Sequence, residues 1–145
     1  MTRYLALDHG SRRIGVAVGD SETGIAFARP ALRRTNAERD LAVVGELCAA
    51  DGIALVIIGL PLNMDGSEGE QAAAARAFGD RLAGIGLSVA YEDERLSSWE
   101  AAERLAGAGR RPPRRSGELD SEAARLTLQR HLDARPGAEG PEETE

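Results

Sequence analysis

Hydrophobic and turn-forming positions alternate along the first third of the chain in a way that predicts three antiparallel strands. Apolar runs cover residues 3–8, 13–19 and 24–32, and only short turn segments separate them. Runs of this length bounded by turn residues are typical of a meander. Pro30 lies within the third run, which predicts an edge strand or a strand that ends there.

The pattern then changes to one of helices and parallel strands. Residues 54–60, ALVIIGL, are apolar throughout, which is typical of a parallel strand buried on both faces, and residues 87–91 predict a fifth strand. Three Ser/Thr-x-x-Glu capping boxes predict helix starts at 35–38, 67–70 and 97–100. A last helix is expected from about Glu118 to Leu132.

The resulting order, β-β-β-α-β-α-β-α-α, predicts a single α/β domain with a mixed five-stranded sheet. Three antiparallel strands are followed by two parallel strands reached through crossover helices, which places helices on both faces. This is the order of a ribonuclease-H-like domain, although other small α/β proteins share it. We expect the domain to cover residues 1–135 and an acidic, disordered tail to cover 136–145.

Charge does not exclude a nucleic-acid partner. The formal net charge is −6, but four of the 24 acidic residues belong to the tail, and 18 basic residues face the other 20. No apolar stretch approaches the ~20 residues of a membrane span. The sequence shows no signal-peptide pattern, and the lone Cys48 has no partner for an internal disulfide. We therefore expect a cytoplasmic protein that does not enter a membrane.

Acidic residues follow or begin elements that meet at one edge of the predicted sheet. Asp8 ends the first strand, Asp93 and Glu94 follow the fifth, and Asp120 lies in the first turn of the last helix. The small residues 123–124 share the helix face of Asp120 and would let that helix lie close to the sheet. Carboxylate oxygens of this kind suit Mg²⁺ or Mn²⁺.

Each acid also has a simpler interpretation. Asp8 precedes a Gly-containing turn, residues 93–95 could be a solvated run of charges, and Asp120 could interact only with the dipole of its helix. The joint placement of all three favours a metal site, because carboxylates from separate elements can hold two metal ions for phosphodiester hydrolysis.

Four ordered motifs together resemble the YqgF/RuvX family. These motifs are ALDHGSRRIGVAVGD (6–20), IIGLPLNMDGSEG (57–69), YEDERLSS (91–98) and LDSEAARLTLQRHL (119–132). Members of that family are named as Holliday junction resolvases or as pre-16S ribosomal RNA nucleases. Gly19 and Ser97-Ser98 stand where family members often have Ser and Thr-Thr.

The resemblance implies a ribonuclease-H-like, Mg-dependent nuclease. It makes Asp8, Glu94 and Asp120 the metal-binding and catalytic triad, with Asp93 as an alternative to Glu94. The implied substrate is structured nucleic acid, either precursor ribosomal RNA trimmed at its 5′ side or branched DNA. The sequence does not choose between RNA and DNA, between one and two metal ions, or between a monomer and a homodimer.

Further polar residues are candidates for contacts with the nucleic-acid backbone. Arg12 and Arg13 follow the Asp8 turn on opposite faces, so we expect at most one of them to clamp a phosphate. Asn63 and Ser67 lie in a loop that leads into a helix N-terminus, where they either bind phosphate or serve only as turn and cap. The remaining candidates are Arg95, Arg110, Arg111, Arg114 and Arg115.

The other aromatic residues and histidines have structural interpretations. Tyr4, Phe27 and Phe78 are expected in the core, and His9 is expected to be structural. His131 lies late on the last helix and is expected to have no functional part. Trp99 is more typical of a helix-start core residue than of a base-stacking one.

Two other classes of function compete with the nuclease. An Asp-x-Gly turn also opens actin-like ATPase domains, but those enclose a nucleotide between two domains and this chain has length for one. A non-catalytic RNA-binding factor in ribosome assembly could keep the same acids without cleaving.

Overall fold

The computed structural model describes residues 1–94 and 118–134. Their strands are β1 (Arg3–His9), β2 (Arg13–Asp20), β3 (Ala26–Arg33), β4 (Leu55–Leu60) and β5 (Val89–Asp93). Their helices are α1 (Ala37–Asp51), α2 (Glu70–Gly84) and α4 (Glu118–Ala134). The proposed domain boundary at residue 135 and the tail beyond it lie outside these ranges.

The strands form one mixed five-stranded sheet in the order β3-β2-β1-β4-β5. β1 lies in the centre, antiparallel to β2 and parallel to β4, while β3 and β5 form the edges. The predicted meander followed by two parallel strands is therefore confirmed. Since β1, β4 and β5 are mutually parallel, their carboxyl ends share one edge of the sheet.

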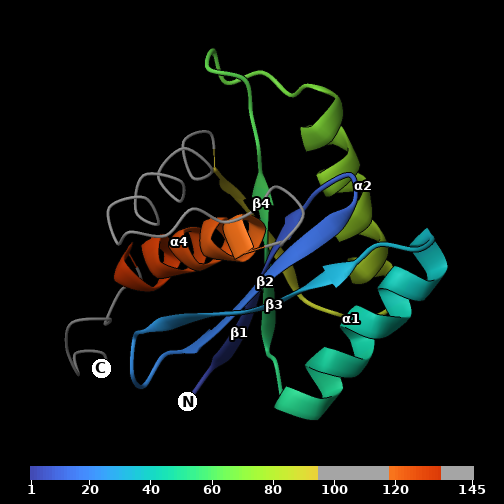
Figure 1. Cartoon of the computed structure of the whole chain (residues 1–145). Coiled ribbons are helices and arrows are strands. Elements are labelled where there is room, and N and C mark those ends of the chain that lie inside the picture. Colours follow the sequence, from blue (N-terminus) through green and yellow to red (C-terminus); the bar gives the residue numbers. More distant parts are fainter. Residues whose placement is uncertain (95–117, 135–145) are drawn as a thin grey trace.

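Helices cover both faces of the sheet, as predicted (Figure 1). Helices α1 and α2 pack on one face against Leu5 and Leu7 of β1. Helix α4 packs on the other face against Tyr4 and Ala6. Because side chains alternate along a strand, Asp8 follows Ala6 onto the α4 face.

Two helix starts differ from the predicted capping boxes. Asn36 rather than Thr35 caps α1, since its Oδ1 accepts a hydrogen bond from the Arg39 amide at 2.9 Å. Both residues are good caps, so the sequence pattern is ambiguous by one position. Helix α2 follows Gly69 and has no side-chain cap, because the Ser67 hydroxyl bonds Asp65 instead. The box at 97–100 lies outside the described residues.

The expectation that Phe27 belongs to the core is wrong, since its side chain is 55% exposed. It lies on edge strand β3, where residues 28–30 are exposed as well. Tyr4 and Phe78 are buried as predicted. None of the helices in the described ranges has the length and apolarity that crossing a membrane requires.

Candidate active site

Asp8 and Glu94 meet at the carboxyl end of the parallel strands. Glu94 directly follows β5, and its amide donates to the Leu60 carbonyl at the end of β4 at 2.9 Å. This extra bond aims the Glu94 side chain back over the sheet, where it hydrogen-bonds Asp8. Both side chains are buried, with 8% of Asp8 and 3% of Glu94 exposed.

A glycine in the strand between them makes this contact possible. Glu94 lies beyond β5, and Asp8 lies on β1, so the Glu94 carboxylate must pass over β4. It does so at Gly59, where a Cβ atom would collide with the carboxylate. On the other side, the Thr127 hydroxyl of α4 lies 3.4 Å from Glu94 Oε1. Any side chain at position 59 would therefore displace Glu94.

Helix α4 brings Asp120 to the same region through a second close approach. Asp8 pairs with Gly15 across β1 and β2, and a Cβ on Gly15 would collide with the Asp120 carbonyl oxygen. The Val16 amide donates to the Ser121 hydroxyl at 3.1 Å, which fixes the start of the helix on the strand. Ala123 and Ala124 are fully buried, as the small-residue pattern predicted.

Burial raises the pKa of all three acids. Burial raises the pKa of Glu94, and repulsion from Asp8 raises it further. Burial also raises the pKa of Asp8, the bond from Glu94 opposes this, and the charge of Asp120 adds to it. Burial raises the pKa of Asp120, while the nearby Arg13 guanidinium lowers it.

The chemistry of these donors fits a hard divalent cation. Carboxylates buried close together are costly to ionise unless a cation compensates them. The raised pKa values of the hydrogen-bonded Asp8 and Glu94 reflect this cost, which a bound cation would remove. Within residues 1–94 and 118–134, no three His, Cys, Asp or Glu side chains are already placed to hold a metal ion. The fit thus lies in the donor types and their burial, and binding would require the acid side chains to adjust.

Of the two neighbouring acids at the end of β5, Glu94 hydrogen-bonds Asp8. Asp93 is exposed, and its carbonyl oxygen accepts a bond from Arg130 Nη1 at 3.5 Å. Strand alternation turns the two side chains to opposite sides. The sequence left the choice open because the last residue of β5 could not be fixed from its pattern.

The predicted backbone-binding residues are placed differently from one another. Arg13 is half-buried and its charge lowers the pKa of Asp120, whereas Arg12 is exposed. Asn63 Nδ2 bonds Ser67 Oγ at 3.0 Å within an exposed loop. The candidates Arg95, Arg110, Arg111, Arg114 and Arg115, and also Trp99, lie outside the described residues.

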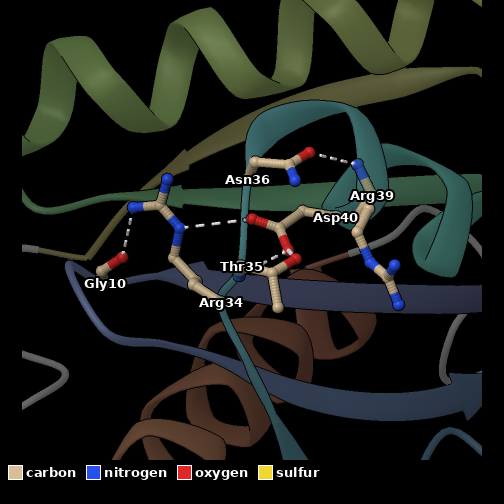
Figure 2. Close-up of polar contacts among 6 residues, drawn as sticks. All are labelled: Gly10, Arg34, Thr35, Asn36, Arg39 and Asp40. Carbon is tan, nitrogen blue, oxygen red and sulfur yellow. Dashed lines mark hydrogen bonds and ion pairs between the residues drawn. The ribbon is translucent and has the colours of Figure 1, made fainter.

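A polar network that sequence reasoning missed anchors the turn after Asp8 (Figure 2). Arg34 Nη1 donates to the Gly10 carbonyl at 3.0 Å, and Arg34 Nε lies 3.4 Å from Asp40 Oδ2. Asp40 is only 5% exposed and also accepts bonds from the Thr35 amide and hydroxyl at 3.1 and 3.2 Å. No local pattern reveals this network, because Gly10 and Arg34 are 24 residues apart.

The two histidines have packing partners. The His9 ring lies against Phe78, with centroids 4.8 Å apart, and burial together with the Arg34 charge lowers its pKa to about 4. His9 is therefore neutral near pH 7, in keeping with the structural part expected of it. His131 Nδ1 lies 2.9 Å from Glu92 Oε2 and its ring meets Tyr4 edge-on.

Comparison with known proteins identifies similar chains over nearly the whole length. A family model described as "RuvX: Holliday junction resolvase" matches residues 2–134. A protein of Anaeromyxobacter dehalogenans named "Putative pre-16S rRNA nuclease" is 45% identical, over 92% of this chain and 98% of its own. A protein of Myxococcus xanthus with the same name is 42% identical, over 91% and 88%.

Solved structures of low sequence identity share the fold. Thermus thermophilus RuvC in complex with a Holliday junction superposes with a TM-score of 0.55 at 15% identity, over 91% of this chain and 96% of that one. The large terminase nuclease of the thermophilic phage G20c also gives 0.55, at 12% identity, over 86% and 81%. The fold is therefore the RuvC-like variant of the ribonuclease H fold.

Proposed function

We propose that this chain, which belongs to the RuvX Holliday junction resolvase family, is a metal-dependent nuclease that hydrolyses phosphodiester bonds in structured nucleic acid. The observation that carries the proposal is the hydrogen bond between two buried acids, Asp8 of β1 and Glu94 after β5, with the charge of Asp120 on α4 acting on Asp8. Two glycines, Gly15 and Gly59, leave the space in which these acids approach.

Asp8, Glu94 and Asp120 would hold the Mg²⁺ or Mn²⁺ ions. A bound ion of this kind stabilises developing charge on the phosphate and lowers the pKa of water. Asp8 connects the three acids, because it is hydrogen-bonded to Glu94 and the charge of Asp120 raises its pKa. Arg13, whose charge lowers the pKa of Asp120, would pair with a substrate phosphate.

The preferred substrate is the 5′ side of precursor 16S ribosomal RNA. Support for this RNA comes from relatives that are 39–45% identical to this chain and are named "Putative pre-16S rRNA nuclease". Cleavage of four-way DNA junctions is the second candidate, because the family model has that description.

A side-by-side cleavage assay tests this function. Precursor 16S RNA and a four-way DNA junction are incubated with the protein in Mg²⁺, in Mn²⁺ and in EDTA. We expect cleavage that needs the metal, with the RNA cut faster than the junction. Faster cutting of the junction would select the second candidate. Tight RNA binding without cleavage of either substrate, in either metal, would contradict the nuclease proposal and indicate a non-catalytic RNA-binding factor.

A further inference from the structure

A cleft lies next to the proposed active site, on the opposite face of the sheet from the Asp8 carboxylate. Its volume is about 230 Å³. Residues 9–11, which follow Asp8 directly, form one wall, and Arg34 contributes to the lining. The first turn of α2 forms the other wall with Glu70, Gln71 and Ala74. The cleft and the acids therefore lie at the same end of β1.

The lining favours a neutral planar group over a phosphate. The Glu70 carboxylate would repel an anion, whereas Glu and Gln side chains pair with the amino and ring-nitrogen groups of nucleobases. Arg34 is held in place by Gly10 and Asp40 (Figure 2), and a fixed guanidinium plane is a surface on which bases stack. Ala74 and Gly10 keep the space between these groups open.

The size of the cleft points to a single ring system. Pockets that enclose drug-sized ligands span roughly 300–1,000 Å³, and this cleft is smaller. A whole nucleotide with its phosphate would exceed it, while one base without its sugar-phosphate would not.

We infer that this cleft receives one unpaired nucleobase of the substrate, from a nucleotide beside the phosphate that is cut. The inference rests on the proposed function and adds to it a requirement for a base that is free of pairing. The substrate strand crosses the carboxyl end of β1, with its phosphate at Asp8 and the neighbouring base on the α2 side. Unpairing costs least in single-stranded or branched regions, so the cleft selects such regions.

Two readouts test the inference, and one of them does not need catalysis. The first scans a single abasic nucleotide through each position near the cut in the cleaved substrate. The second measures fluorescence of short single-stranded RNA and DNA that carry one 2-aminopurine, titrated with protein in EDTA. Both use wild type, Ala74→Leu, which fills the cleft, and Ala83→Leu, the same change on an exposed part of α2 away from it. Gln71→Ala is a second cleft variant that removes a side chain from an exposed helical position.

For wild type and Ala83→Leu we expect one abasic position to slow cleavage about 5- to 150-fold, the range that corresponds to roughly 1–3 kcal/mol for one stacked base. Ala74→Leu should cut abasic and intact substrates at equal rates, and both cleft variants should lose the 2-aminopurine response. Equal cleavage at every abasic position by wild type, with a fluorescence response that Ala74→Leu retains, would overturn the inference and leave the nuclease proposal intact. If wild type cuts no substrate but changes the 2-aminopurine fluorescence, and Ala74→Leu abolishes that change, the nuclease proposal is overturned. The proposal that the cleft binds a base is then supported.

Discussion

Individual acidic residues could be predicted to different extents. Asp8 and Asp120 could be named as candidates from the sequence because each lies near the end or the start of an element with a clear pattern. The choice of Glu94 over Asp93 required the register of β5 on β4, which places Leu60 opposite Asp93 and leaves Glu94 beyond the last pair. Pairing between distant strands is invisible to local patterns, so the sequence could name the acids but not their geometry.

Tyr91 gives a prediction about pH that lies away from the acids. Its hydroxyl lies 2.5 Å from Asp80 Oδ1, and burial followed by this bond raises its pKa to about 12. The folded state therefore prefers the protonated phenol. This contribution is complete below the ordinary value of about 10 and is lost as the pH rises towards 12.

Alkaline titration of phenolate absorbance measures this shift directly. The difference between wild type and Tyr91→Phe should show one tyrosine that ionises near pH 12 in the folded protein. In denaturant, the same difference should move to about pH 10. A folded-state midpoint near 10 would contradict the bond to Asp80.

At the scale of elements, boundaries followed the sequence closely, while contacts between elements did not. The strands begin and end within about two residues of the hydrophobic runs. The N-caps of α1 and α2 differ from the predicted ones. Thr35 and Asn36 compete for the cap position of α1, and the Ser67 hydroxyl bonds within its own loop and does not cap α2. The need for Gly15 appears only when α4 packs on β2.

Gly15→Ala tests that contact between α4 and β2. The new methyl would collide with the backbone at Asp120 and lie 2.8 Å from the Ser121 amide nitrogen, so α4 must move. We expect a loss of about 1–3 kcal/mol in the free energy of unfolding. Cleavage should also fall, on the order of 10²-fold for a displacement of Asp120 by about 1 Å. Urea unfolding and single-turnover cleavage measure the two effects.

Gly45→Ala is the matched control in helix α1. A Cβ there has only the Ile85 Cδ1 atom nearby, at 3.9 Å, so it fits without strain. Ala is a better helix former than Gly by about 1 kcal/mol, so this variant should be more stable than wild type and cleave normally. Equal behaviour of the two variants would show that α4 does not approach Gly15 closely.

At the scale of the whole molecule, the mixed antiparallel and parallel pairing of the sheet could be predicted from the sequence. The exposure of edge strand β3 could not. Short connections favour the antiparallel meander and the two helical crossovers favour the parallel strands, whereas the strand order β3-β2-β1-β4-β5 is known only from the structure. The exposure of Phe27 depends on where the helices stop covering β3, which no local pattern encodes. The same topology places β1, β4 and β5 with their carboxyl ends together, which lets Glu94 reach Asp8. Asp120 approaches separately, through the packing of α4 on β2.

The central claim is that Asp8 is a metal ligand of a nuclease. Asp8→Asn removes the carboxylate but keeps a side chain of the same shape that can accept the bond from Glu94. The fold should persist, because Asn keeps an oxygen that can accept this hydrogen bond and removes a buried group that is costly to ionise. Asp20→Asn is the matched control, since Asp20 lies at the far end of the same hairpin and its turn bonds to Glu22 and Thr23 amides need only an accepting oxygen.

The most direct measurement is the single-turnover cleavage rate of wild type, Asp8→Asn and Asp20→Asn in saturating Mg²⁺ on the substrate that wild type cuts fastest. We predict that Asp8→Asn loses more than the roughly 10–100-fold that removal of a ligand's supporting partner costs, while Asp20→Asn stays at the wild-type rate. Folded Asp8→Asn protein that cuts at the wild-type rate would contradict the assignment of this site.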